Sequence, residues 1–371
     1  MIGVGASGPA ATRRGRASER EHWIALSQLP GIGPAGFAQL IRRHGAAAEA
    51  WRATVADAGR ADPREAVRLL DRRTRALGGR IVTGLDEEYP LALRTLDPRP
   101  PTLFVAGDGF ALATRAVAIV GTRRASGYGL TVATELADEL GRADMSVVSG
   151  LALGSDGAAH RAAVAAGGRS VAVLPSPLDR IYPPRHRSLA REIVRTGGAL
   201  VTELAVGTPV GRPDFARRNR VIAGLAEAVV VIEAPDRSGA LLTAAAAIAI
   251  GRELYAVPGP IDALASRGCN RLIADHDAVM VTSVTALMRL IGVARGARPP
   301  AVNDLSEVEG QLLRHLLERS GSIEELVDRS GQPPASVASA LTLLESRGLV
   351  NPFGGATFHP TLAAKRLAGV V

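Results

Sequence analysis

Short apolar runs alternate with segments of helical periodicity through the middle of the chain. Val117–Val120 is apolar and β-branched without polar alternation, which predicts a strand buried on both faces of a sheet. A glycine-rich turn follows, and Leu130–Leu140 then repeats its apolar residues at helical spacing. Because this order recurs, we predict an α/β fold with a doubly wound, mostly parallel sheet. The expected strands are Val117–Val120, Ser146–Ser149, Ser170–Leu174, Leu200–Thr202, Ala228–Glu233, Glu253–Val257 and Ala278–Val281, and the helices between them include Ala158–Ala166, Ser188–Thr196, Arg220–Ala226 and Leu241–Ile250.

The same pattern divides the chain into domains. Residues 1–18 lack periodicity and are expected to form a disordered tail, and residues 19–78 have a helical pattern. Residues 79–291 hold the sheet, led in by two strand-like runs, Arg80–Thr83 and Thr102–Ala106. A Gly/Pro/Arg-rich segment at 292–303 predicts a linker. Residues 304–371 combine three helical patterns with a two-stranded wing, an order typical of a winged helix.

The two outer domains carry motifs with two interpretations each. Leu29–Leu40 has the form of a helix-hairpin-helix, whose Gly-Ile-Gly hairpin can offer amides to a DNA phosphate. The same unit also occurs as a purely structural piece of small helical domains. In the winged helix, the expected recognition helix Pro334–Ser346 is almost uncharged. A major-groove reader would carry Arg, Asn or Gln there, so we expect protein contact or packing instead.

Charge and composition narrow the partners. The formal net charge is +8, and Lys365 is the only lysine. The preference for Arg over Lys fits a GC-rich genome, whereas the excess of positive charge supports a nucleic-acid partner. No apolar run reaches the ~20 residues of a membrane helix, and the amino-terminal residues lack a signal-peptide core. The single cysteine, Cys269, excludes an internal disulfide framework and fits a cytoplasmic location.

The turn after the first expected strand is a candidate phosphate site. A strand that runs through small residues into a helix leaves unpaired amides at the helix start, where phosphate binds. Gly121, Thr122, Arg123, Arg124 and Ser126 supply small residues and mobile positive charge here. The alternative is an ordinary strand-to-helix turn. The spacing matches neither the dinucleotide fingerprint nor the P-loop, so no NAD or nucleoside triphosphate cofactor is expected.

Polar and small residues also follow the other strands. In an open parallel sheet, ligands bind beyond the carboxyl ends of the strands, so these residues should share one crevice. Arg217, Arg218 and Arg220 lie within four residues, and their positive charges would repel one another unless an anion is bound nearby. The alternative is a solvated helix start at which these arginines pair with carboxylates. We infer a polyanion site, and its further candidates are Ser149, Gly150, Tyr182, Arg185, Arg187, Arg217, Arg218, Asn219, Arg220, Ser238 and Gly239.

Catalytic groups are few. Asp156 is best explained as a helix N-cap, and His160, four residues later, as a polar helix residue. No paired carboxylates, Ser-His-Asp arrangement or metal-ligand spacing stands out, and Cys269 has no CxxC partner. We therefore expect a binding protein without catalytic residues, metal or cofactor. Sparse aromatics, with Tyr128, Tyr182 and Phe215 as crevice candidates, favour sequence-indifferent binding through the strand backbone.

Taken together, these segments resemble the DprA/Smf family of DNA-processing proteins. The likeness spans Val117 to about Leu287 and rests on the stretches VAIVGTRRAS, VVSGLA, LDRIYPPRHR, TE, GTP, DFARRNRVIAGLA, VIEAPDRSGALLTA, YAVPGP and SRGCNRLI. The resemblance implies an extended Rossmann-like domain that binds single-stranded DNA, with a helical domain before it and a winged helix after it. It also implies a homodimer that protects incoming DNA and loads RecA recombinase onto it in natural transformation.

Carried onto this sequence, the resemblance assigns strand binding to Arg123 with Gly121 and Thr122, and to the Arg217–Arg220 cluster. Tyr182–Arg185 would form a further wall. The chain departs from the family pattern at a few positions. Leu153 stands where a basic residue is usual, Ser155 where a branched apolar residue is usual and Gly157 where alanine is usual, and Arg185-His186 replaces an acidic residue and asparagine.

An enzyme on a related fold is the alternative function. Phosphoribohydrolases of the cytokinin-activating kind cleave a nucleotide at its ribose–phosphate bond, and they need a Pro-Gly-Gly-x-Gly-Thr-x-x-Glu run. The corresponding stretch here, which begins at Arg237-Ser-Gly, has no carboxylate at that place. Release of free base from nucleoside monophosphates would distinguish that enzyme from a binding protein. A third possibility is an interaction scaffold, which would not retard single strands in a gel.

Overall fold

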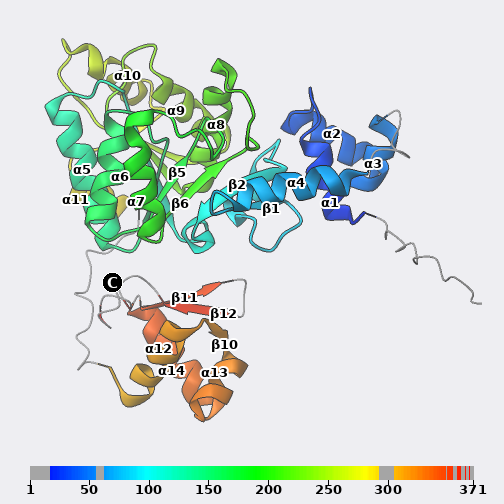
Figure 1. Ribbon diagram of the computed structural model, residues 1–371. Coiled ribbons are helices and arrows are strands. Elements are labelled where there is room, and N and C mark those ends of the chain that lie inside the picture. Colours follow the sequence, from blue (N-terminus) through cyan, green and yellow to red (C-terminus); the bar gives the residue numbers. More distant parts are fainter. Residues whose placement is uncertain are drawn as a thin grey trace, which may run out of the picture.

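The computed structural model describes residues 17–55, 62–291, 305–347, 349–353, 357–360, 364 and 367 (Figure 1). The tail expected at 1–18 lies outside the described residues except for Ala17 and Ser18, and Ser18 caps the first helix by accepting a hydrogen bond from the Glu21 amide at 3.2 Å. The linker expected at 292–303 also lies outside the described residues.

A nine-stranded sheet organises the main domain, with strand order β1-β2-β6-β5-β4-β3-β7-β8-β9. The strands β3 to β9 pair in parallel, and β1 and β2 extend the sheet in antiparallel fashion beside β6. This confirms the predicted α/β class. The strands are β1 Gly79–Thr83, β2 Thr102–Gly107, β3 Ala116–Val120, β4 Ser146–Ser149, β5 Ser170–Val173, β6 Ala199–Thr202, β7 Ala228–Val231, β8 Glu253–Ala256 and β9 Val279–Met280.

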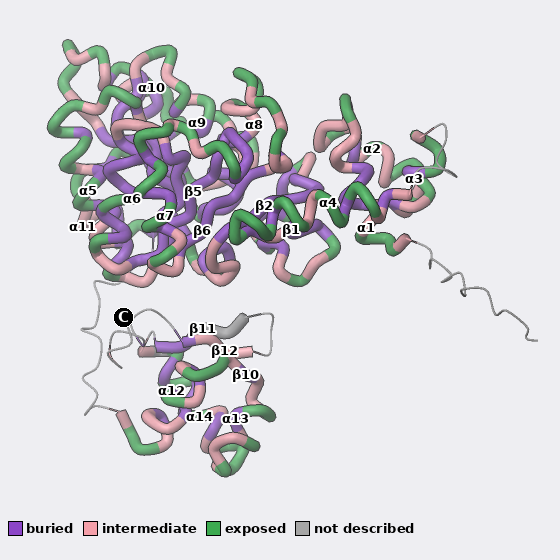
Figure 2. The backbone as a smooth tube through the Cα atoms, in the orientation of Figure 1, coloured by how far each residue is buried: buried purple, intermediate pink, exposed green. Residues whose placement is uncertain are grey.

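Helices cover both faces of this sheet, as expected of a doubly wound fold. One face carries α5 (Gly127–Arg142), α6 (Ser155–Ala165), α7 (Arg187–Arg195) and α11 (Val284–Leu290). The other face carries three helices, namely α8 (Arg212–Leu225), α9 (Gly239–Ala249) and α10 (Arg267–Ala274). Figure 2 shows most of the strand residues as the buried centre of the domain, which fits their largely apolar sequences.

The chain order of the strands creates a switch point at β3. From β3 the chain moves outward through β4, β5 and β6, and it then returns to place β7 on the other side of β3. Helices that follow β3 and β7 consequently leave on opposite faces of the sheet. Their connecting turns diverge and leave a crevice at the carboxyl edge, where ligands bind in folds of this kind.

The amino-terminal helices pack on the β1–β2 end of the sheet. They are α1 (Glu19–Ser27), α2 (Pro34–His44), α3 (Ala47–Thr54) and α4 (Pro63–Arg75). The indole nitrogen of Trp23 donates to the Pro101 carbonyl at 2.8 Å, which fixes α1 to the strand region. The expected hairpin lies between α1 and α2, where Gly31 has φ of +81°, a conformation that favours glycine.

A separate core lies in the carboxyl-terminal domain. The helices α12 (Glu307–Glu318), α13 (Ile323–Ser330) and α14 (Pro334–Ser346) pack beside a three-stranded sheet of order β10-β12-β11. The wing strands are β11 (Val350–Phe353) and β12 (Thr357–Pro360). The sequence predicted two strands, and the third, β10 (Gly321–Ser322), is too short to give a periodic signal. Nowhere in the described segments is there a helix that is both long and apolar enough to span a membrane.

Two local expectations differ from the structure. The helix expected at Arg220–Ala226 begins earlier, at Arg212, with Pro213 in its first turn and Asp214 accepting the Gly211 amide at 2.7 Å. Asp156 is not the N-cap of α6, because Gly154 holds that position with φ of +74°. The carboxylate of Asp156 instead turns back to accept the amides of two loop residues before the helix.

Candidate nucleic-acid interface

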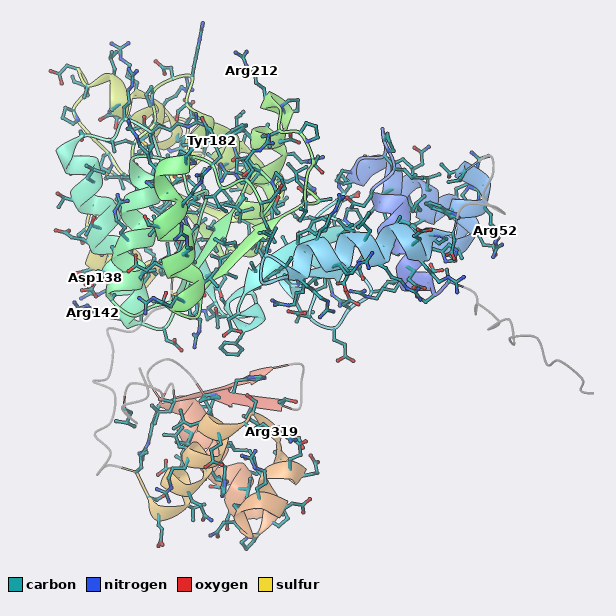
Figure 3. All side chains as sticks on the ribbon, viewed as in Figure 1. Arg52, Asp138, Arg142, Tyr182, Arg212 and Arg319 are labelled. Atoms are coloured by element: carbon teal, nitrogen blue, oxygen red, sulfur yellow. The ribbon has the colours of Figure 1, made fainter. Side chains whose placement is uncertain are left out.

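A trough of about 560 Å³ opens at the switch point of the sheet. It is bounded by the turn after β3, the loop before α6, the first half of α8 and the start of α9. Figure 3 labels Arg212 and Tyr182 on this side of the main domain. We call this feature the trough and define it by its lining residues, which are Val120, Gly121, Thr122, Arg123, Arg124, Ala152, Asp156, Arg212, Phe215, Ala216, Arg218, Asn219, Ile222, Pro235, Arg237, Ser238, Gly239, Ala240, Leu242 and Thr243.

Close packing of backbone shapes the floor of the trough. A Cβ at Gly121 would collide with the side chain of Ser155, so only glycine lets β3 approach α6 this closely. Thr122 donates its amide to the Glu233 carbonyl at 2.7 Å and accepts the Ser155 amide at 3.3 Å. The turn after β3 is therefore held from both sides, with its outer residues left facing the trough.

Ser126 anchors the start of α5 and is occupied in doing so. Its hydroxyl donates to Glu233 Oε1 at 2.5 Å and accepts the Gly129 amide at 3.1 Å. Its own amide donates to Glu233 Oε2 at 2.9 Å. Glu233, 3% exposed, thus uses both carboxylate oxygens on one serine and does not line the trough. Ser126, predicted to touch DNA, sets the position of the turn that carries Arg123 and Arg124.

Positive charge dominates the trough. Arg123, Arg124, Arg212 and Arg237 are exposed lining residues. In the part of the chain that the structure describes, no carboxylate forms an ion pair with any of these four side chains. Asp156 is the one acidic lining residue, and it is buried with its carboxylate bonded to backbone amides. An anion can therefore approach four guanidinium groups without displacing an acidic side chain.

Aromatic rings lie along one side of the trough, where Phe215 is a lining residue and Tyr182 packs against it from outside the lining. The guanidinium carbon of Arg123 lies 5.4 Å from the centre of the Phe215 ring. Tyr182 meets the same ring edge-on, with 5.6 Å between ring centres and 86° between the planes. Tyr182 is 44% exposed. The three side chains come from the turn after β3, from α8 and from the loop after β5, so the fold assembles a stacking platform from distant segments.

The loop behind the trough is held by buried polar groups. The carboxylate of Asp156 accepts the amides of Gly150 and Ala152 at 3.2 and 3.3 Å. Arg218, 8% exposed, donates from Nη1 to the carbonyls of Gly150 and Val173, both at 2.6 Å. Burial lowers the pKa of Arg218 to about 10, so its guanidinium stays charged at neutral pH. Burial raises the pKa of Asp156, and the nearby Arg218 charge opposes that shift.

Two histidines support the same loop from beneath. His160 is fully buried, accepts the Leu151 amide on Nε2 at 3.2 Å and bonds through Nδ1 to the Ser170 hydroxyl at 2.7 Å. Burial lowers its pKa to about 3, so it is neutral and unsuited to proton transfer at neutral pH. His186 bonds to the Leu151 carbonyl at 2.9 Å. Leu151 itself has φ of +58°, so both backbone groups of a strained residue are fixed.

Comparison with known proteins agrees across the chain. The family profile described as DNA recombination-mediator protein A matches residues 80–292. A DprA-like N-terminal HHH domain profile matches residues 17–74, and a DprA winged helix domain profile matches residues 296–356. This chain belongs to the DNA recombination-mediator protein A family. The resemblance to DprA/Smf proteins inferred from the sequence is therefore confirmed.

Relatives in this family cover most of the chain. A Mycobacterium tuberculosis relative whose name includes "DNA processing protein DprA" is 39% identical over 338 residues, which cover 86% of this chain and 85% of that protein. The X-ray structure of DNA processing protein A from Streptococcus pneumoniae is 28% identical, with a TM-score of 0.61 over 76% of this chain and 99% of that one. DNA processing protein A from Helicobacter pylori, whose structure concerns a unique single-stranded DNA binding mode, is 27% identical, with a TM-score of 0.53 over 57% and 95%.

The structure brings half of the predicted site residues to the trough of this DprA/Smf protein. Those that line it come from the turn after β3, from α8 and from the start of α9. Ser149 is buried and donates its hydroxyl to the Ile119 carbonyl at 2.6 Å, and Gly150 lies against Arg218 behind the trough. The predicted residues that line the trough are Gly121, Thr122, Arg123, Arg124, Arg218, Asn219, Ser238 and Gly239.

The arginine cluster on α8 is divided between two sides of the helix. Arg217 donates to Asp214 at 2.9 Å, and Arg220 forms an ion pair with Glu203 at 2.5 Å. Burial raises the pKa of Glu203, and the charges of Arg220 and Arg217 oppose that rise. Neither arginine lines the trough. Arg217 and Arg220 therefore fit the alternative given in the sequence analysis, in which arginines at a solvated helix start pair with carboxylates. Of the three arginines, Arg218 is the one that lines the trough.

Two trough arginines were not among the site residues predicted from the sequence, although the helix start that follows Arg237 was noted. Arg212 opens α8, and Arg237 precedes Ser238, whose hydroxyl caps α9 by accepting the Ala240 amide at 3.3 Å. Arg237 could have been found, because a cation one residue before a helix start lies beside its anion-binding amides. Arg185 and Arg187 are exposed on the loop before α7 and at its first residue, and they do not line the trough.

Proposed function

We propose that this protein binds single-stranded DNA in the trough, chiefly through the sugar–phosphate backbone. The observation that carries the proposal is a set of four exposed trough arginines, Arg123, Arg124, Arg212 and Arg237, beside one buried carboxylate. Amides at the start of α9 add to the field at the same edge, whereas the start of α5 already holds the Glu233 carboxylate. The single-stranded DNA binding mode of the Helicobacter pylori protein supports the same ligand class.

The aromatic wall suits a single strand better than a duplex. A base that stacks on Phe215 takes the place of the Arg123 guanidinium on the ring and frees that cation for the neighbouring phosphate. Bases of a duplex are stacked on each other and cannot do this. Because every base has a π face, such stacking is indifferent to sequence.

The test is a titration of oligo-dT and of a matched duplex, each at several salt concentrations. If about four phosphates are neutralised, affinity for oligo-dT should fall about fiftyfold between 50 and 200 mM salt, from a slope near −0.7 per contact. The duplex should bind more weakly. An affinity for oligo-dT that does not change with salt would reject the proposal.

We further propose a finer role, which membership of the family supports. We assign to this protein the protection of incoming strands and the loading of RecA recombinase onto them in natural transformation, in the cytoplasm. The description of the family as a recombination mediator supports this role. The test compares RecA filament assembly on oligonucleotides with the wild type and with an Arg237→Glu variant, which should stimulate less at the same protein concentration.

We also assign a non-enzymatic role and a homodimeric state. Both Glu233 oxygens bond to Ser126, and the Asp156 carboxylate bonds to loop amides, so neither is presented to a ribosyl centre. The apolar helix α9 exposes Leu242 and Ile248, 54% and 45%, and is our candidate for the dimer surface. Release of base from nucleoside monophosphates would oppose the first assignment, and a monomer mass by light scattering would oppose the second.

A further inference from the structure

A row of exposed arginines runs along α7, outside the trough. Arg187, Arg191 and Arg195 are spaced four residues apart, and all three are exposed. With 100° per residue, they lie on one stripe of the helix, turned away from its buried residues Leu189 and Ile193. Successive arginines rise by about 6 Å, so the row spans about 12 Å.

These arginines lack acidic partners among the residues that the structure describes. Across the described ranges no carboxylate pairs with Arg187, Arg191 or Arg195, and no hydrogen bond from their guanidinium groups is found. Glu192 is the one acidic residue of the helix; it lies about 140° from Arg187 and 100° from Arg191, and it stands three residues before Arg195 without forming an ion pair with it in the structure. The contrast with Arg217 and Arg220 is direct, because those two arginines are held by Asp214 and Glu203. The guanidinium groups of the α7 row are therefore not held in ion pairs and can meet an external anion, with Glu192 beside Arg195 as the one nearby negative charge on the helix.

The row begins close to the wall of the trough. Tyr182 contacts Phe215, which lines the trough, and Arg187 follows Tyr182 by five residues. Five residues of chain reach at most about 18 Å, so the first arginine of the row lies within that distance of the aromatic wall. Arg185, exposed on the short η3 turn (Pro184–His186), lies between them in the chain. Figure 1 shows α7 descending along the side of the sheet next to α6.

We propose that the α7 row, Arg187, Arg191 and Arg195, is a second segment of the strand-binding surface. A single strand that leaves the trough over Tyr182 would continue along α7 with its phosphates on this row. The inference rests on the proposed function, since it extends the trough rather than replacing it. Charge complementarity and continuity with the trough favour nucleic acid over an acidic protein surface as the occupant.

The strand-length dependence of binding tests this inference. The variant Arg187→Gln/Arg191→Gln/Arg195→Gln removes three cations and keeps residues of good helix propensity. For a strand short enough to fill only the trough, such as dT6, its affinity should match that of the wild type. For dT25 it should bind on the order of tenfold more weakly, and its salt slope should be smaller by about 2, from about 0.7 for each of three lost contacts.

A charge-matched variant controls for net charge. Arg68, Arg72 and Arg73 are exposed on α4, in the helical domain, and their replacement by glutamine removes the same charge. That variant should bind dT25 like the wild type, and both variants should keep the wild-type Tm. An equal loss of dT25 affinity in the two variants, or unchanged dT25 affinity in the α7 variant, would overturn this inference. Neither result would affect the proposal that the trough binds single-stranded DNA. Wild-type protein that binds neither oligonucleotide would instead reject the proposed function.

Discussion

Arg218 donates a hydrogen bond to the carbonyl oxygen of Gly150 at 2.6 Å, across 68 residues of sequence. The guanidinium lies so close to the Gly150 Cα that a Cβ there would collide with it. Through the same nitrogen Arg218 also holds the Val173 carbonyl at the end of β5. The residue thus ties together two loops behind the trough and presents only part of its surface to a ligand.

This relationship predicts that Arg218→Ala loses stability as well as DNA binding. The change removes two hydrogen bonds to buried carbonyls and the cation that offsets the burial of Asp156, at a cost of about 3 kcal/mol. Urea unfolding measures the loss. Arg237→Ala is the comparison, because Arg237 is exposed and should lose affinity for oligo-dT without a change in the free energy of unfolding. Equal stability of the two variants would contradict the positioning role of Arg218.

The stacking platform leads to a second prediction. Phe215→Leu keeps an apolar side chain but removes the π face, and it should weaken oligo-dT binding by about 1–3 kcal/mol, or roughly 5- to 150-fold. Phe215→Trp should retain most of the affinity because it keeps an aromatic face. Fluorescence anisotropy with labelled oligo-dT measures both. Wild-type affinity in the leucine variant would show that no base stacks on this ring.

Much of the sheet could be predicted because its central strands are buried on both faces. The predicted ends of the seven parallel strands lie within two residues of the observed ends. Runs such as Val117–Val120 contain no polar residue that would suggest helical periodicity, so they are easily recognised as buried strands. The start of α8 was missed for the opposite reason. Residues Arg212–Arg220 are polar and arginine-rich, so they give no apolar periodicity, and the helix there depends on Pro213 and the Asp214 cap.

That missed helix also explains the division of the arginine cluster. Arg217 and Arg220 are three residues apart and share one side of α8, whereas Arg218 lies about 100° away. Had the predicted helix begun at Arg212, helical geometry would have placed Arg218 on a different side of it from Arg217 and Arg220. The partner Glu203, however, follows β6, which is adjacent only through the folded sheet. No local pattern could therefore have shown that Arg220 is paired.

Gly157 and His186, where the resemblance to the family implies alanine and asparagine, form one packing unit. A Cβ at Gly157 would lie 2.5 Å from His186 Cε1, so the histidine ring occupies the space that an alanine methyl would need. We predict that Gly157→Ala destabilises the protein by about 1–3 kcal/mol through overpacking. His186→Asn should restore most of that loss in the double variant, because asparagine is smaller. Thermal unfolding of the four proteins gives the coupling, and strictly additive effects would contradict this explanation.

The buried His160 predicts a loss of stability in acid. Its folded-state pKa is lowered to about 3 by burial, with smaller contributions from His186, Arg218 and Arg161, while an unfolded histidine titrates near 6.5. Between these values the unfolded state binds the extra proton, so stability is full above pH 6.5 and falls as the pH decreases. From pH 7 to pH 5 the free energy of unfolding should fall by about 2 kcal/mol from this residue alone.

Substitution of His160 isolates this contribution from that of Asp156, whose raised pKa acts in the opposite direction at lower pH. In His160→Gln the acid-dependent loss should shrink by about 2 kcal/mol, although the variant is less stable at neutral pH, and urea unfolding at both pH values measures the difference. Identical slopes in the wild type and in His160→Gln would mean that the imidazole can be protonated within the folded protein.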